Sequence, residues 1–194
     1  FNVRKIIMPL GISFFTFQTI SYLIDVYRKD VVADKVGADT IRYLYAGANI
    51  TNDMRFGFTL TDEARRKLMN FWNAYIFYNT YACIDKPDVQ NFKPDFKNLN
   101  VTDRWLIEKV NKFVKDSDEN YANNKNFVVV KDFENLVDDL TNFYIRVNRR
   151  RFWKSDDKQD QTTAYWCLYT ALKSMIQVMA PIIPFMTEAI WQNL

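Results

Sequence analysis

The stretch FVVVKDFENLVDDLTNFYIRVNRRRFWK, residues 127–154, carries most of the information about the fold of this 194-residue chain. Its apolar residues recur at steps of three or four, which is the period of one face of an α-helix. The sequence therefore predicts a helix over 127–154 that packs on neighbouring helices through one apolar stripe. The stripe consists of Phe133, Leu136, Val137, Leu140, Tyr144 and Val147.

A second stripe on the same predicted helix is polar and basic. It consists of Asn142, Arg146, Arg149 and Trp153, again at steps of three or four. Arg150, Arg151 and Lys154 adjoin it, so that five positive charges fall within nine residues. A helix C-terminus favours each cation by about 0.3–1 kcal/mol, so a solvated basic helix end is one explanation. The other is a nucleic-acid interface, with arginines on phosphates and Trp153 stacked on an unpaired base.

Further amphipathic helices are predicted on both sides of this stretch. Thr61 is a plausible N-cap for one of them, and SDDKQDQ, residues 155–161, is a polar loop that precedes another. Several amphipathic helices in series predict an all-α fold, an antiparallel helix bundle. The expected helices cover residues 34–47, 61–83, 102–114, 127–154, 162–180 and the segment from 185 onward.

Composition argues for binding and against catalysis. The chain has no histidine, which excludes Ser-His-Asp and Cys-His sites, histidine-based zinc sites and a histidine general base. No Gly-rich phosphate loop is present. Cys83 and Cys167 show no disulfide or metal-site spacing, so both are expected to be buried, reduced thiols, and no metal is expected. The net charge of +3 is small, so the placement of the basic residues matters more than their number.

A weaker basic cluster is formed by Arg65, Arg66 and Lys67 in the helix predicted from residue 61. Asp62 and Glu63 directly precede it. Because opposite charges close together on a helix form surface ion pairs, we expect local neutralisation here, with nucleic-acid contact as the alternative.

The first part of the chain has a different character. Residues 6–24 contain no charged side chain and, as a helix, would be about 28 Å long, which matches the hydrocarbon core of a bilayer. A membrane span and a buried core helix both fit this composition. We therefore expect an apolar N-terminal helix ahead of the bundle.

Four blocks of the sequence resemble class I aminoacyl-tRNA synthetases, most closely the isoleucyl type, over about residues 34–194. They are GADTIRYLY, TDRWLIEKVN, LVDDLTNFYIRVNRRRFW and LYTALKSMIQVMAPIIPFMTEAIWQNL, in the family's order. The valyl and leucyl enzymes share this architecture, so the amino acid stays open. The third block is the most specific of the four.

The resemblance implies a cytoplasmic protein whose helical domain binds the anticodon stem and loop of tRNA. Residues 31–60 would connect it to a catalytic domain, and residues 61–194 would form the anticodon-binding domain, truncated at the C-terminus. The RNA contacts would come from Asn142, Arg146, Arg149, Arg150, Trp153 and Lys154. The family's HIGH motif needs histidine, and FFTFQTISYL stands where its KMSKS loop would lie. This chain alone is therefore expected to be non-catalytic and to bind no cofactor, with ATP implied only for the parent ligase.

Residues 1–28 instead resemble a transmembrane segment of membrane-bound O-acyltransferases, which predicts a chimeric chain in which residues 1–30 are foreign to the function. Two alternatives stay open. The chain could be a membrane-anchored interaction module related to O-acyltransferases, in which case it would lie at a membrane. The arginine cluster could also dock against the catalytic domain of the parent synthetase instead of RNA.

Overall fold

The structure is a computed structural model that describes residues 37–49, 57–96, 99–153, 155 and 157–194. Throughout these residues the regular structure is helical, without a strand, which confirms the predicted all-α fold. The described elements are α2 (Gly37–Ala46), α3 (Phe58–Asp85), α4 (Val101–Ala122), α5 (Asn126–Asp138), the π-helix η1 (Asp139–Ile145), α6 (Arg146–Trp153), α7 (Lys158–Met179) and α8 (Pro184–Trp191).

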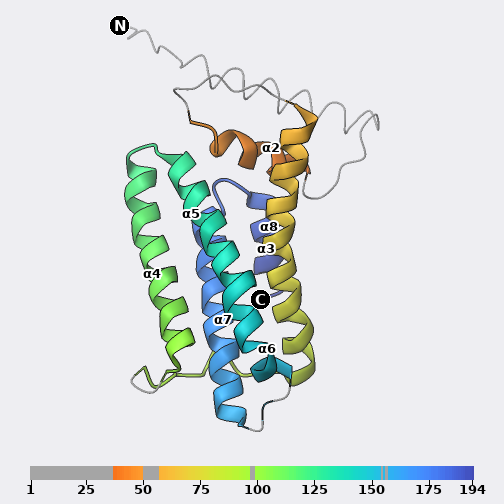
Figure 1. Ribbon diagram of the computed structural model, residues 1–194, viewed down its shortest axis with the longest axis vertical. Helices are drawn as coiled ribbons and strands as arrows, with labels where there is room; N and C mark the ends of the chain where they lie inside the picture. Colours follow the sequence, from red (N-terminus) through yellow and green to blue (C-terminus); the bar gives the residue numbers. More distant parts are fainter. Residues whose placement is uncertain (1–36, 50–56, 97–98, 154, 156) are drawn as a thin grey trace, which may run out of the picture.

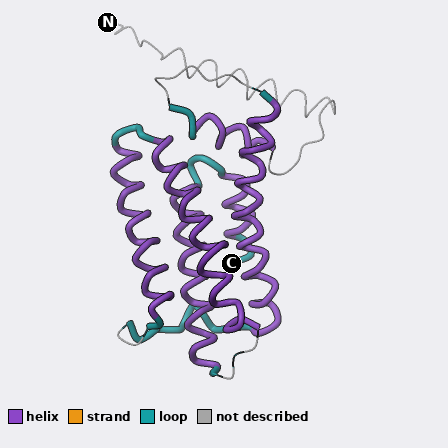
Figure 2. The backbone as a smooth tube through the Cα atoms, viewed as in Figure 1, coloured by secondary structure: helices purple, strands orange, loops and turns teal. Residues whose placement is uncertain are grey.

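The long helices lie side by side as a bundle. α3, α4, α7 and the continuous rod of α5, η1 and α6 follow the long axis of the molecule, and successive rods alternate in direction (Figure 1). The loops gather at the two ends of the bundle, as the tube view shows (Figure 2). α2 lies across one end and α6 lies at the opposite end (Figure 1).

Aromatic side chains form the middle of the core. The Phe133 ring lies 5.1 Å from that of Phe71 and 6.3 Å from that of Tyr43 between ring centroids, both edge-to-face. Near the α6 end, the Phe152 ring is 5.1 Å from that of Tyr165 and 5.4 Å from that of Phe77. Such pairs contribute about 0.5–1.5 kcal/mol each beyond the burial of their area. The apolar stripe predicted for residues 127–154 therefore does face the core, with one exception.

The exception is Val147, which was expected in the core but is 56% exposed. The π-helix causes this difference, because it has more residues per turn than an α-helix and so shifts the register of everything after it. From Leu136 to Phe152, one row of buried residues accordingly follows intervals of four, and it consists of Leu136, Leu140, Tyr144, Asn148 and Phe152. Val147 is turned out to the surface and Asn148 takes the inner position.

Three smaller expectations were also wrong. Gly57, and not Thr61, is the N-cap of α3; the Thr61 hydroxyl donates to the carbonyl oxygen of Gly57 at 3.3 Å, within the first turn. α4 continues to Ala122, past the end expected from the polar residues that follow its apolar face. Cys83 is exposed, while Cys167 is buried as predicted.

The GADTIRYLY block fastens α2 to the start of α8. The backbone N–H of Met186 donates to Asp39 Oδ2 at 2.6 Å and that of Phe185 to Oδ1 at 3.3 Å, so that Asp39 caps α8 from a distant helix. Arg42 donates to the carbonyl oxygens of Pro181 and Ile182 at 2.8 and 2.9 Å. Burial raises the pKa of Asp39, although the hydrogen bonds from the backbone N–H groups of Met186 and Phe185 oppose this effect. The first and last described helices are thereby tied together.

The apolar stretch predicted over residues 6–24 lies outside the described residues. Among the helices of the described part, none combines the length and the apolar character that a membrane crossing requires.

Candidate nucleic-acid interface

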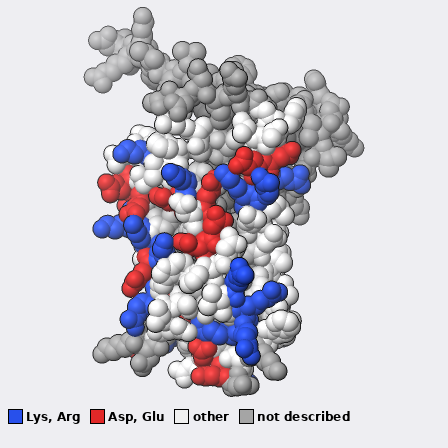
Figure 3. All heavy atoms as spheres, in the orientation of Figure 1, with Lys and Arg blue, Asp and Glu red and all other residues white. Residues whose placement is uncertain are grey.

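Five of the predicted contact residues lie on the exposed side of the η1–α6 rod. We call this set the basic edge: Asn142, Arg146, Arg149, Arg150 and Trp153, all exposed. Basic side chains gather in this part of the surface, over the lower end of the bundle in the view of Figure 3. The sixth predicted residue, Lys154, lies outside the described residues.

Trp153 and Arg149 form the tip of the basic edge. The Trp153 side chain is 69% exposed, and the guanidinium carbon of Arg149 lies 6.0 Å from the centre of its ring. Such an exposed cation–π contact contributes about 0.5–1 kcal/mol. Arg146, Arg149 and Arg150 form no ion pair with any described residue, so their charge is available to a ligand.

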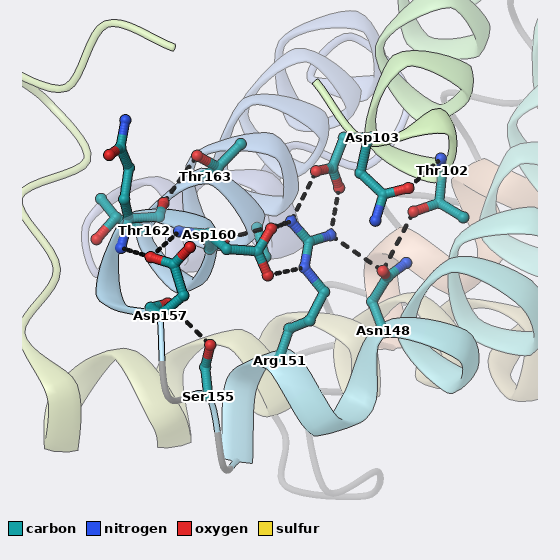
Figure 4. A network of polar contacts seen from close by, with 12 residues as sticks. Thr102, Asp103, Asn148, Arg151, Ser155, Asp157, Asp160, Thr162 and Thr163 are labelled. Atoms are coloured by element: carbon teal, nitrogen blue, oxygen red, sulfur yellow. Dashed lines mark hydrogen bonds and ion pairs between the residues drawn. The ribbon is translucent and has the colours of Figure 1, made fainter. Parts of the chain in front are cut away.

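Arg151 behaves differently from its neighbours, because it points into the bundle. Its guanidinium binds Asp103 of α4 through two parallel hydrogen bonds of 2.8 Å each. A second pair of bonds, at 2.8 and 2.6 Å, reaches the Asp160 carboxylate of α7. Figure 4 shows the guanidinium between the two carboxylates. Arg151 thus joins α6 to α4 and α7 and contributes no free charge to the basic edge.

Neutral side chains complete this network. The Asn148 side-chain oxygen accepts from Arg151 at 3.0 Å and from the Thr102 hydroxyl at 3.2 Å, and the Asn148 amide nitrogen donates to the backbone oxygen of Tyr144 at 3.0 Å. The Tyr144 hydroxyl donates to Asp103 at 2.7 Å. Every polar group drawn into the core here therefore has a partner, as burial demands.

The electrostatics of the network hold Arg151 in its charged form. Burial by itself would lower the pKa of Arg151, but hydrogen bonds with Asp103 and Asp160 and the charge of Asp103 raise it above its usual value. Burial, and after it the charge of Asp103, raises the pKa of Tyr144. The Arg151 guanidinium and its two carboxylate partners together carry a net negative charge. This network therefore cannot itself attract phosphate.

In the second predicted cluster, Lys67 forms ion pairs with two glutamates. Lys67 Nζ lies 3.0 Å from the Glu134 carboxylate of α5 and 3.6 Å from that of Glu63 one turn earlier, as the expected local neutralisation requires. Arg65 and Arg66 are exposed on α3. Glu134 also accepts from the Tyr43 hydroxyl at 3.0 Å, which makes Lys67 part of the packing between α2, α3 and α5.

Sequence reasoning missed two exposed apolar residues beside the basic edge, Phe143 and Val147. Phe143 was assigned to neither stripe and Val147 was assigned to the core. The signal that could have placed them is the spacing of four between Leu136, Leu140 and Tyr144, which departs from the mean period of an α-helix.

Comparisons with known proteins show which family this chain is similar to. Residues 103–194 match the family described as the anticodon-binding domain of tRNA ligase. The chain is 39% identical over 176 residues to the isoleucine–tRNA ligase of Dehalococcoides mccartyi (strain CBDB1), a match that covers 88% of this chain and 17% of that protein. Its identity to the Thermus thermophilus isoleucine–tRNA ligase is 39% over 163 residues, covering 81% of this chain and 15% of the relative.

A third relative gives the same result. The isoleucine–tRNA ligase of Methanocaldococcus jannaschii is 36% identical over 178 residues, which cover 88% of this chain and 16% of that protein. The chain therefore spans less than a fifth of the length of these relatives. Two of these matches cover 88% of this chain, which is more than residues 34–194 make up. The similarity in these two matches therefore begins before Asp34. These matches give no support to the resemblance with O-acyltransferases.

Proposed function

Residues 103–194 belong to the anticodon-binding domain family of tRNA ligases, and from this we propose that the chain binds the anticodon stem and loop of a tRNA through the basic edge. The chain acts as part of an isoleucine–tRNA ligase, whose other parts perform the ATP-dependent aminoacylation. The absence of histidine supports this division of labour, because the chain lacks the family's HIGH element.

One observation carries the proposal: three exposed arginines and an exposed Trp share one side of a rod, while the fourth arginine is neutralised inside the bundle. Arg146, Arg149 and Arg150 offer guanidinium forks that match phosphate oxygens in two-point hydrogen bonds. Trp153 offers a flat ring to an unpaired base. These are the two contact types that recognition of a folded RNA loop requires.

The decisive experiment removes charge from the basic edge and follows the salt dependence of binding. The chain is titrated with tRNA at about 50 mM and about 200 mM salt, since each phosphate contact adds a roughly constant increment to the salt slope. The double variant Arg149→Ala/Arg150→Ala should bind more weakly at low salt, and its slope should be smaller by about two units.

A matched control removes the same charge elsewhere. Lys112→Ala/Lys115→Ala takes two exposed cations from α4 and should leave both the affinity and the salt slope close to those of the wild type. Equal losses in the two double variants would mean that RNA responds to total charge alone. Wild-type affinity in the Arg149/Arg150 variant would instead favour docking of this edge against the catalytic domain.

A further inference from the structure

An apolar pair interrupts the basic edge. Phe143 of η1 and Val147 of α6 are 44% and 56% exposed. On a helical surface they are neighbours of Arg146 and Arg150, three residues further along in each case. A large exposed aromatic ring among cations has no role in the core and is an expected element of a surface that binds unpaired bases.

Trp105 of α4 braces the Phe143 ring. The two ring centroids are 4.8 Å apart at an interplanar angle of 69°, an edge-to-face contact. Lys109 lies 5.5 Å from the centre of the Trp105 ring and pairs with Asp139 at 3.0 Å. The contact restricts the orientation of Phe143 although almost half of its side chain is exposed, and the ion pair neutralises the nearest carboxylate of η1.

The exposure of Phe143 follows from the π-helix. Leu140, Tyr144 and Asn148 occupy the inner positions at intervals of four. Phe143 and Val147 directly precede two of these positions, are themselves four residues apart, and face outward. π-Helical turns within α-helices are rare and frequently occur at functional sites. The outward position of this ring is thus set by the same feature that turns Val147 to the surface.

We propose that Phe143, braced by Trp105, is a second stacking position for an unpaired base of the bound RNA. The inference rests on the proposed function and deepens it. Phe143 and Trp153 are ten residues apart, roughly 15 Å along a helix axis, whereas stacked bases are about 3.4 Å apart along a strand. The two rings therefore take bases that are not neighbours, which requires a loop with splayed bases and excludes a paired duplex as the preferred ligand.

Two RNA probes test this inference: a hairpin with an unpaired loop and a fully paired duplex of equal length. Phe143→Ala should lower the affinity for the hairpin by about 5- to 150-fold, the usual effect of one base–aromatic stack. Its affinity for the duplex and its salt slope should match those of the wild type, because no charge is lost. Phe143→Tyr should restore hairpin binding, since the tyrosine ring also stacks.

Phe185→Ala is the matched control, because Phe185 is an exposed phenylalanine on α8. It should leave hairpin affinity unchanged. If Phe143→Ala binds the hairpin as tightly as the wild type while Arg149→Ala/Arg150→Ala is weakened, the stacking position is refuted and the proposed function stands. If the wild type shows no salt-dependent binding to either RNA, the proposed function fails and the stacking position with it.

Discussion

The two faces of α6 both carry arginine, but in opposite environments. On the inner face, the side chain of Arg151 is 13% exposed and has two carboxylates as partners. On the outer face, Arg150 is one residue away, exposed, and has no ion pair within the described part of the chain. The difference comes from α4 and α7, which supply Asp103 and Asp160 to one face only. Charge counted along a sequence is therefore not the charge that a ligand meets.

The largest expected effect comes from removing the inner arginine. Arg151→Ala leaves the fully buried Asp103 without its charged partner, and breaking a buried pair in this way costs about 3–5 kcal/mol. We expect the free energy of unfolding, measured by urea denaturation, to fall by this amount. Arg150→Ala should change the same quantity by less than about 0.5 kcal/mol, as exposed substitutions do.

The Arg151→Lys variant sharpens the comparison between the inner and the outer face, through both its stability and its binding to tRNA. Lysine keeps the charge but cannot bind two carboxylates through parallel bonds, so its loss of stability should lie between those of the other two variants. Under conditions where it is folded, Arg151→Lys should also show the wild-type salt slope with tRNA. A reduced slope would show that Arg151 contributes to the outer face, contrary to its position.

A moderate effect is expected at Tyr144, whose hydroxyl donates to Asp103 on the inner face. Tyr144→Phe removes one buried hydrogen bond while Asp103 keeps Arg151, so a loss of about 0.5–1.5 kcal/mol in the free energy of unfolding is expected. The effect should depend on pH. Burial and the charge of Asp103 raise the pKa of Tyr144, so its contribution is complete below the unfolded value of about 10 and is lost as the pH rises beyond it.

Denaturation at pH 8 and in alkaline buffers measures this linkage. The wild type should lose stability above about pH 10, and Tyr144→Phe should lose less. Part of the alkaline loss should persist in the variant, because burial also raises the pKa of Tyr121 to about 12. Identical pH profiles for the two proteins would mean that Tyr144 is not held in its neutral form by the inner face.

Local periodicity predicted most of the fold and the outer face, because both depend on steps of three and four along one helix. Five of the six predicted contact residues share one exposed side for this reason; whether they bind RNA stays a prediction. The inner face could not be predicted, because the partners of Arg151 lie on other helices, α4 and α7, and one of them is remote in the sequence. Asp103 is 48 positions from Arg151, and the spacing within α6 holds no trace of it.

The π-helix was the second obstacle. Its residues have no composition that sets them apart from the α-helices beside them, and an α-helical period extended through them assigns Val147 to the core. Asn148 occupies the inner position that the shift in register creates. Because asparagine is mostly found at the surface of proteins, its position in the sequence gives no sign of this shift. Its hydrogen bonds with Thr102 and Arg151 explain how it is tolerated there.

Two valines on the same rod test this register, and the change at the second of them, Val147, has the smallest expected effect. Val137 is buried before the π-helix and Val147 is exposed after it. Val137→Ala removes two buried carbon atoms and should lower the free energy of unfolding by about 2 kcal/mol. Val147→Ala should change it by less than about 0.5 kcal/mol, and a slight gain is expected because alanine favours the helix. Equal losses would place Val147 in the core, and the outward position of Phe143 would lose its structural basis.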